Sequence, residues 1–163
     1  MFEEGELLRV PAVSSDILCY QLYEDPVLFV APHDGGDIET APPDWIELLQ
    51  NHLLLTHSHP GYWDDLLLAI EYLKVPLRTM KVTQNDIARR FIEEGFGVSF
   101  LPQTSVNREL IEGRLLAVPT PELLLPKTAT YLLVPPKTAW TEAIEHFVSV
   151  LRIQFPNMEP LDS

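Results

Sequence analysis

The stretch from residue 83 to residue 118 constrains the fold of this chain more than any other part of it. Its first half has the pattern of an amphipathic helix, with apolar residues at positions 87, 91 and 92 and charged residues on the opposite face. Thr83 and Asp86 have the spacing of a capping box, which predicts that the Thr83 hydroxyl accepts a hydrogen bond from the amide three residues on. Gly95 supplies the left-handed residue that commonly ends a helix. We therefore expect a helix that ends just before Gly95.

A buried strand and a second helix follow at close spacing. Residues 97–101 are short, apolar and followed by Pro102, a pattern that favours a buried parallel strand. The second helix is expected over residues 103–112 and ends at Gly113, and residues 114–118 return as another apolar strand. Helix, strand, helix and strand in this order are typical of a layered α/β protein with βαβ-type units.

Two segments of this stretch carry a resemblance to a known family. They are FIEEGFGVSFLP at residues 91–102 and, after the second helix, EGRL at residues 112–115. Their order and spacing are similar to the effector-binding domain of LysR-type transcriptional regulators, in which Gly-x-Gly, an apolar strand, Leu-Pro and a helix ending in Gly-x-Leu follow one another. The resemblance implies a Rossmann-like lobe of the periplasmic-binding-protein type 2 fold, with a mixed sheet and helices on both faces. The alternative is that these glycines are caps and tight turns in an unrelated α/β protein.

The same resemblance implies a division of the chain. Residues 1–31 would hold part of effector lobe I and the first of two strands that cross between the lobes, broken at Asp25-Pro26. Residues 32–128 would form a complete effector lobe II. Residues 129–163 would hold the second crossing strand and the C-terminal helix of lobe I, with a frayed end after Pro156. The winged helix-turn-helix, the linker helix and the first half of lobe I of a complete regulator have no counterpart in this sequence.

Charge and cysteine content limit the function classes. The chain has 24 acidic and 11 basic residues, and phosphate backbones repel a surface with this net charge of −13, so we expect no nucleic-acid binding by the chain alone. A single cysteine, Cys19, cannot form an internal disulfide, which fits a reducing compartment. The N-terminus is acidic, unlike a signal peptide, and no apolar run reaches membrane-spanning length. We therefore expect a cytoplasmic protein with no membrane partner.

Small polar residues stand where strands are expected to end and helices to begin. Amides and hydroxyls at helix N-termini can bind anions without lysine or arginine, and in open α/β sheets such sites lie at the carboxyl ends of strands. In LysR-type regulators the effector binds in the cleft between the lobes, and matching positions can be assigned here. The candidate ligand-binding residues are Thr56, His57, Ser58, Thr83, Gln84, Ser99, Phe100 and Pro102. Ordinary helix capping is the alternative explanation for each of them.

Motifs for catalysis or metal binding are weak. His57 and His59 form a His-x-His pair, but no Cys or further His supplies the remaining ligands of a zinc site, which favours polar turn residues. The adjacent carboxylates at 64–65 and 93–94 point to different sides of a helix and so do not suit an acid–base pair. The sequence contains no Gly-x-Ser-x-Gly, no P-loop and no dinucleotide fingerprint. We therefore expect no catalytic residue, no metal and no cofactor.

Together these features favour the ligand-sensing part of a LysR-type transcriptional regulator. It would bind a small-molecule effector, expected to be an organic anion, and bias DNA-binding domains elsewhere in the full-length protein. The resemblance also implies a homo-oligomer, a dimer or tetramer, of the full-length protein. Two alternatives stay open: a stand-alone solute-binding protein of the same two-lobed fold, which the missing export signal disfavours, and a small α/β enzyme, which the missing catalytic constellation disfavours.

Overall fold

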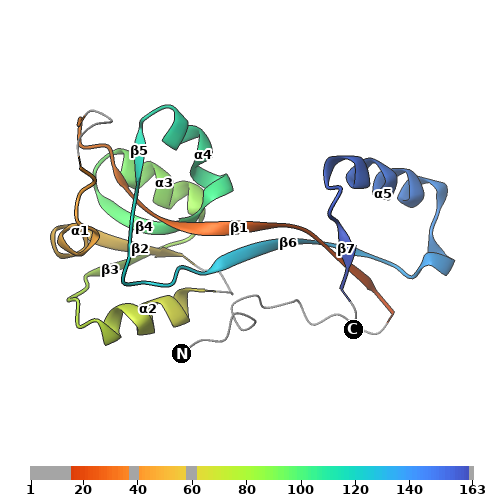
Figure 1. Cartoon of the computed structure of the whole chain (residues 1–163), viewed down its shortest axis with the longest axis horizontal. Helices are drawn as coiled ribbons and strands as arrows, with labels where there is room; N and C mark the ends of the chain where they lie inside the picture. Colours follow the sequence, from red (N-terminus) through yellow and green to blue (C-terminus); the bar gives the residue numbers. More distant parts are fainter. Residues whose placement is uncertain (1–15, 37–40, 58–61, 162–163) are drawn as a thin grey trace. The chain divides into compact units, whose positions relative to one another are not determined.

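The computed structural model describes residues 16–36, 41–57 and 62–161 of the 163-residue chain. Strands and helices alternate over most of this length (Figure 1), which confirms the α/β class expected from the sequence. In chain order the elements are β1 (Leu18–Pro32), α1 (Trp45–Asn51), β2 (Leu53–His57), α2 (Trp63–Tyr72), β3 (Thr79–Val82), α3 (Asn85–Glu93), β4 (Gly97–Pro102), α4 (Gln103–Ile111), β5 (Leu115–Val118), β6 (Lys127–Val134), the 3-10 helix η1 (Lys137–Ala139), α5 (Glu142–Gln154) and β7 (Glu159–Pro160).

The chain separates into two compact units. The central unit comprises residues 26–127, and the terminal unit comprises residues 1–25 together with residues 128–163. Strands β1 and β6 each contribute to both units, and they pair with one another. Residues 26–31, which the family resemblance placed with the first part of the chain, belong to the central unit in the structure.

The central unit is built on a mixed sheet with the strand order β3-β2-β4-β1-β5. Strand β2 runs parallel to both β3 and β4, whereas β1 runs antiparallel to both β4 and β5. The strand expected at residues 97–101 is therefore parallel to its neighbour on one side only. Parallel neighbours need a crossover connection, and α2 and α3 supply the two crossovers from β2 through β3 to β4.

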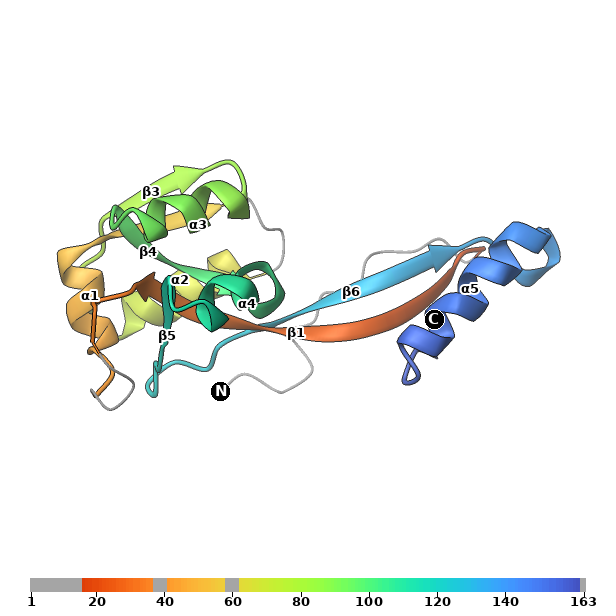
Figure 2. The same cartoon turned by 90° about the horizontal axis from the view of Figure 1, so that it is seen from above.

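Helices cover both faces of this sheet (Figure 2), which confirms the layered arrangement expected from the sequence. Successive residues of a strand point to opposite faces, so each strand contributes to two cores. The first core joins the strands to α1 and α2, and the second joins them to α3 and α4. Principal members of the first are Phe29, Trp45, Leu54, Trp63, Leu66, Ile70 and Phe100, and of the second Val30, Leu55, Ala88, Ile92, Leu101 and Val106.

Strand β4 is buried along its whole length, between β2 and β1. Its first residue explains how it approaches β2 so closely. A Cβ atom added to Gly97 would lie 2.6 Å from the carbonyl oxygen of Leu53 and 2.9 Å from Cγ of Leu55. Separations this short do not occur at real Cβ atoms, so β4 can take this place beside β2 because residue 97 has no side chain.

The C-terminal ends of α3 and α4 agree with the sequence expectations, whereas the N-terminal end of α3 does not. Gly95 and Gly113 follow α3 and α4 with φ values of +79° and +69°, which confirms them as left-handed helix-ending residues. The predicted capping box is wrong. Gln84 occupies the N-cap of α3, and no side chain donates or accepts a capping hydrogen bond there. Strand β3 continues to Val82, so the chain needs Thr83 and Gln84 for the bend into α3, and Thr83 lies one residue too early to cap.

In the terminal unit, α5 packs on β1, β6 and the residue before β7, around Tyr20, Val134, Val148 and Met158. The Thr141 hydroxyl caps this helix by accepting a hydrogen bond from the Ile144 amide at 3.4 Å. The helix expected near residues 141–155 and the strand near residues 128–134 are therefore both present.

Two expectations about the ends of the chain are wrong. Strand β1 runs without a break through Asp25-Pro26, because its pairing with β4 begins at Val27 and this ladder needs no amide from proline. The segment after Pro156 is also not frayed within the described residues. Glu159 pairs with Gln21 of β1, and the Leu161 amide donates a hydrogen bond to the Cys19 carbonyl at 2.8 Å.

A buried carboxylate links the helices that cover the second core. The Glu109 side chain on α4 is 7% exposed and lies 3.4 Å from both Arg89 of α3 and Arg114, the residue just before β5. Arg114 also contacts Glu93 at 2.6 Å, and Arg89 donates a hydrogen bond to the Ser105 carbonyl at 3.3 Å. Charged side chains therefore tie α3, α4 and β5 together over one face of the sheet.

Replacing Gly97 with alanine should destabilise the protein more than replacing Gly113 with alanine. At Gly97 the added methyl group meets the Leu53 backbone, and overpacking of this kind typically costs about 1–3 kcal/mol. At Gly113 the methyl group meets open space, and the left-handed backbone costs about 1 kcal/mol. Urea unfolding of both variants measures the difference. Equal losses would contradict the close approach of β4 to Leu53.

Replacing Glu109 with glutamine should lower the free energy of unfolding by about 1–3 kcal/mol, because two arginines lose a charged hydrogen-bond acceptor in a buried position. Arg108→Gln is the matched control, since Arg108 is 79% exposed and forms its ion pair with Glu112 at the surface. That exposed pair should contribute less than about 1 kcal/mol. Thermal or urea unfolding at two salt concentrations compares the variants, and a larger loss for Arg108→Gln would refute this assignment.

Candidate functional site

Seven of the eight candidate ligand-binding residues lie within the described residues, and Ser58 lies outside them. The parallel strands β2, β3 and β4 end at His57, Val82 and Pro102, so their carboxyl ends lie at one edge of the central sheet. Ser99 and Phe100 lie further inside β4. The residues that the structure brings to this edge, which we call the carboxyl edge, are Thr56, His57, Thr83, Gln84 and Pro102.

The sequence favoured a polar turn residue at position 57, whereas the structure places His57 at the end of β2, buried and hydrogen-bonded. The Tyr62 hydroxyl lies 3.0 Å from His57 Nε2 and 3.0 Å from the carbonyl oxygen of Phe100. This hydroxyl has one proton and the carbonyl can only accept, so both contacts are hydrogen bonds when Nε2 carries a proton and donates to Tyr62. The three residues join the end of β2, the start of α2 and the middle of β4.

Aromatic rings enclose His57. The Trp63 ring meets the imidazole edge to face at a centroid distance of 5.3 Å, and the Tyr62 ring does so at 5.9 Å. The Trp63 indole N–H is buried and has no hydrogen-bond partner among the described residues. The sequence pattern assigns no role to Tyr62, because the carbonyl that accepts its hydrogen bond, at Phe100, is 38 residues away in the chain.

Ser99 is fully buried, and its hydroxyl donates a hydrogen bond of 2.6 Å to the Leu55 carbonyl. This bond joins β4 to β2 inside the central sheet. The Ser99 hydroxyl therefore has a structural partner, and its assignment to an effector site stays a prediction. Phe100 is likewise fully buried, and its ring centroid lies 4.8 Å from that of Phe29. Its backbone carbonyl accepts the hydrogen bond from Tyr62.

The start of α3 is the most accessible part of the carboxyl edge. Thr83 and Gln84 are exposed, and α3 begins without a side-chain cap, which leaves its first amides to other acceptors. Lys81 adds a positive charge that the sequence analysis missed. It is exposed, it is the register partner of Thr56 on the neighbouring strand, and it forms no ion pair with another described residue.

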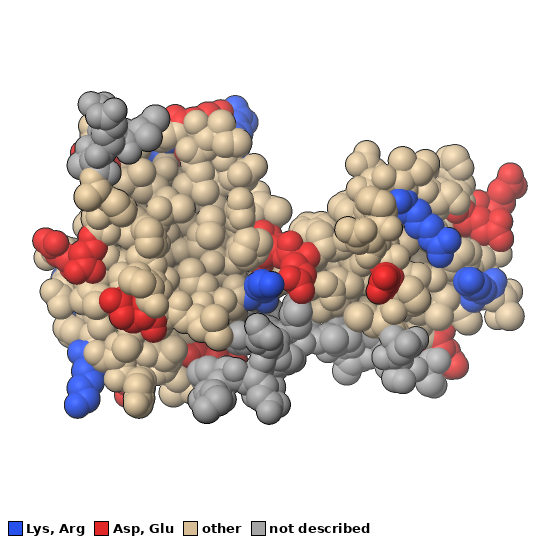
Figure 3. Space-filling model, in the orientation of Figure 1, with Lys and Arg blue, Asp and Glu red and all other residues tan. Residues whose placement is uncertain are grey.

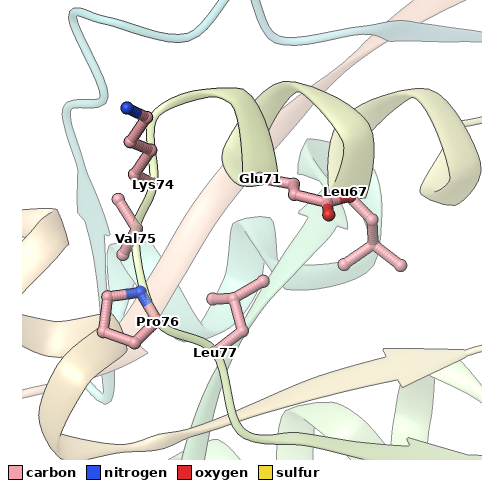
Figure 4. Close-up of a pocket in the computed structure, with 6 residues that line it drawn as sticks. All are labelled: Leu67, Glu71, Lys74, Val75, Pro76 and Leu77. Atoms are coloured by element: carbon pink, nitrogen blue, oxygen red, sulfur yellow. The ribbon is translucent and has the colours of Figure 1, made fainter.

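A hollow of about 440 Å³ lies at the opposite edge of the sheet, between the end of α2 and the start of β3. Figure 4 shows its lining, which is mostly apolar with one carboxylate and one ammonium group at the rim. None of the seven described candidate residues lines it. The lining residues are Leu67, Glu71, Lys74, Val75, Pro76 and Leu77.

Within the described residues, no three His, Cys, Asp or Glu side chains come together in a group that could hold a metal ion. Cys19 is buried, and burial raises the pKa of its thiol, which disfavours the nucleophilic thiolate. Among the described helices, none is long and apolar enough to cross a membrane.

Basic side chains are sparse on the face of the molecule shown in Figure 3. Blue lysine and arginine side chains stand apart from one another on this face, several of them beside red carboxylates, and they form no continuous stripe there. Nucleic-acid-binding surfaces usually gather lysine and arginine along one face or helix.

Comparisons with known proteins agree with one another. A family model described as the LysR substrate binding domain matches residues 7–156. The HTH-type transcriptional regulator CitR of Bacillus subtilis (strain 168) is 49% identical over 118 residues, which cover 72% of this chain and 40% of CitR. The uncharacterized HTH-type transcriptional regulator YxjO of the same strain is 34% identical over 143 residues, which cover 85% of this chain and 45% of YxjO. The chain thus spans less than half the length of these two relatives.

Solved structures with a similar fold are also regulatory domains. The apo-form of the HypT regulatory domain from Salmonella typhimurium has a TM-score of 0.62 at 20% identity, covering 96% of this chain and 70% of that domain. The CcmR regulatory domain of Synechocystis PCC6803, solved in complex with 2-PG, has a TM-score of 0.66 at 16% identity, covering 91% of this chain and 71% of that domain. At these identities the likeness shows the fold alone, and it confirms the expected fold class.

Replacing Tyr62 with phenylalanine should destabilise the central unit by about 1–3 kcal/mol, because the change leaves His57 Nε2 and the Phe100 carbonyl without this partner in a buried place. Tyr72→Phe is the matched control, since Tyr72 is 87% exposed on the same helix. Urea unfolding compares the two variants. If both changes lower the free energy of unfolding by the same small amount, the Tyr62 hydroxyl does not stabilise the carboxyl edge through His57 and Phe100.

Proposed function

This chain belongs to the LysR substrate binding domain family, and on that premise we propose that it binds a small organic anion for a LysR-type transcriptional regulator. The observation that carries the proposal is the family match over residues 7–156. We further propose that the anion contacts the carboxyl edge of the central unit, within the inter-lobe cleft of the complete effector domain. CitR and YxjO, which are regulators of the helix-turn-helix type, support the transcriptional role.

Three features of the carboxyl edge support an anionic ligand. The uncapped start of α3 offers backbone amides, and a helix N-terminus carries a partial positive charge that favours anions. The Thr83 and Thr56 hydroxyls can donate further hydrogen bonds. The Lys81 ammonium group lies on the strand beside Thr56 and has no carboxylate partner among the described residues, so it can pair with a ligand carboxylate.

The proposed mechanism is a shift between conformations of the full-length regulator. An effector changes the population of two states only when it binds one of them more tightly, and contacts from two lobes provide such a difference. The DNA-binding part would lie elsewhere in the full-length protein, which we propose to be a dimer or tetramer. Because the chain carries a net charge of −13, we propose that it has no nucleic-acid affinity of its own. We also propose that it works in the cytoplasm with no membrane partner, since a transcriptional regulator acts where the DNA is.

Catalysis is not part of this proposal. The relatives are transcriptional regulators, and the Cys19 thiol, with its raised pKa, is not poised as a nucleophile. A turnover assay run beside the binding assay tests this directly, because a binding domain releases its ligand unchanged.

Thr83→Ala and Lys81→Gln should each weaken effector binding in the full-length regulator that carries this chain. Loss of a hydrogen bond to a charged ligand costs about 1.5–3 kcal/mol, or roughly ten- to more than a hundredfold in affinity. The probe is the first member of a panel of mono-, di- and tricarboxylates that binds the unmodified regulator in isothermal titration. Neither change should alter stability, because Thr83 caps no helix and Lys81 is exposed.

Thr79→Ala is the control for these variants. Thr79 is exposed at the start of β3, at the opposite edge of the sheet, so its replacement should leave affinity unchanged. Full affinity in both the Thr83 and Lys81 variants would show that the effector does not bind at the carboxyl edge. The family assignment would survive that result, since it rests on the match over residues 7–156.

Ser99→Ala separates a structural role from a ligand contact. The structure gives the Ser99 hydroxyl a buried acceptor at Leu55, so its loss should lower the free energy of unfolding by about 1 kcal/mol. Affinity should then change little at temperatures well below the melting point. A large loss of affinity with an unchanged melting temperature would instead assign Ser99 to the effector.

A further inference from the structure

The hollow beside α2 is lined by side chains that are anchored in the first core. Val75 belongs to that core, and the half-buried Leu67 and Leu77 pack against it. Lys74, with a left-handed φ of +56°, turns the chain from α2 into residues 75–77, which line the hollow together with Leu67. The volume of about 440 Å³ falls within the range of about 300–1,000 Å³ that is typical of small-molecule sites. The hollow therefore combines an apolar wall with room for a small ligand.

The charges at this end of α2 favour a cation over an anion. The last carbonyl groups of a helix carry a partial negative charge, and the last turn of α2 holds Glu71 and no basic residue. Glu71 forms no ion pair with another described residue, so its carboxylate is available to a ligand. Figure 4 shows the Glu71 carboxylate beside Leu67, whereas the Lys74 side chain extends away from Leu67 and Leu77. The charge next to the apolar wall is therefore negative.

We propose that this hollow binds a primary aliphatic ammonium ion. Its ammonium group pairs with the Glu71 carboxylate at the C-terminal end of α2, and its alkyl chain leaves water to contact Leu67, Val75 and Leu77. The net charge of −13 raises the local concentration of small cations around the whole chain. A carboxylate ligand would meet like charge here, so this site and the anion site proposed at the carboxyl edge select opposite classes of ligand.

Three probes with the same alkyl chain separate the contribution of charge from that of apolar contact: hexylamine, hexanol and hexanoate. An alkylamine is protonated at pH 7, as the lysine side chain is. An amide chemical-shift titration of the isotope-labelled 163-residue chain measures binding at residues 67–77. We expect saturable shifts there with hexylamine, weaker binding of hexanol and no binding of hexanoate. Shortening the amine should weaken binding by roughly two- to fourfold for each methylene removed.

Glu71→Gln should weaken hexylamine binding by about two- to fivefold, the range of an exposed ion pair, and leave hexanol binding unchanged. Glu71 is exposed, so this variant should fold, and circular dichroism checks this. Asp64→Asn is the matched control, because it removes the same charge from an exposed position at the other end of α2. Asp64 lies about 10 Å from Glu71 along the helix, beyond the Debye length of about 8 Å at physiological salt. Its replacement should leave hexylamine binding unchanged.

The proposal is overturned if hexylamine gives no saturable shifts at residues 67–77, or if hexanoate binds there as tightly as hexylamine. Equal loss of affinity in the Glu71 and Asp64 variants also overturns it, because overall charge would then attract the amine. Equal shifts at exposed apolar side chains elsewhere, such as Phe96 and Ile111, would show unspecific adhesion and overturn it as well. The inference does not rest on the proposed function, and its failure leaves the anion site at the carboxyl edge untouched.

Discussion

The fold of the central unit depends on the burial of β4 between β2 and β1. Its side chains supply both cores, with Phe100 on one face and Leu101 on the other, so the two helical layers are held by the same strand. The approach to β2 is possible because Gly97 presents no Cβ to the Leu53 carbonyl. The Ser99 hydroxyl adds a side-chain bond to Leu55 within the same pair of strands. A change in this strand therefore affects both faces of the sheet at once.

The candidate site depends on the same arrangement. Parallel pairing of β2 with β3 and β4 brings the ends of three strands to one edge, where α2, α3 and α4 begin. The Tyr62 hydroxyl stabilises this edge by forming hydrogen bonds with both His57 of β2 and the Phe100 carbonyl of β4. The buried side chains at this edge therefore hold the strands together, and we propose that the accessible part, around Thr83 and Lys81, recognises the ligand.

Much of this fold could be predicted from local patterns. Glycines at positions 95 and 113 depend on neighbouring residues only, and both end helices as predicted. The apolar run of β4 likewise predicted a buried strand, whereas its pairing, parallel to β2 and antiparallel to β1, depends on distant residues. Features that depend on distant residues could not be predicted. The capping box at Thr83 failed because the length of β3 is set by its pairing with β2, which leaves Thr83 in the bend. The break at Pro26 failed because β1 needs no amide there.

The same distinction holds for the candidate site. Sequence spacing and family resemblance placed Thr56, His57, Thr83 and Gln84 at strand ends, and the structure brings them to one edge. They could not show that His57 is buried against Trp63, or that Lys81 lies beside Thr56, because both facts arise from strand register and packing. The sequence could not decide whether the Ser99 hydroxyl faces a ligand or the core, and the structure shows it hydrogen-bonded to Leu55 inside the sheet.

Binding of an anion at the carboxyl edge can be located without any substitution by an amide chemical-shift titration of the isotope-labelled chain with a panel of small carboxylates. We expect saturable shifts for a member of the panel at Thr56, His57 and the first turn of α3, with little change at the hollow beside α2. Saturable shifts confined to that hollow, at residues such as Leu67 and Leu77, or to the terminal unit would contradict binding at the carboxyl edge.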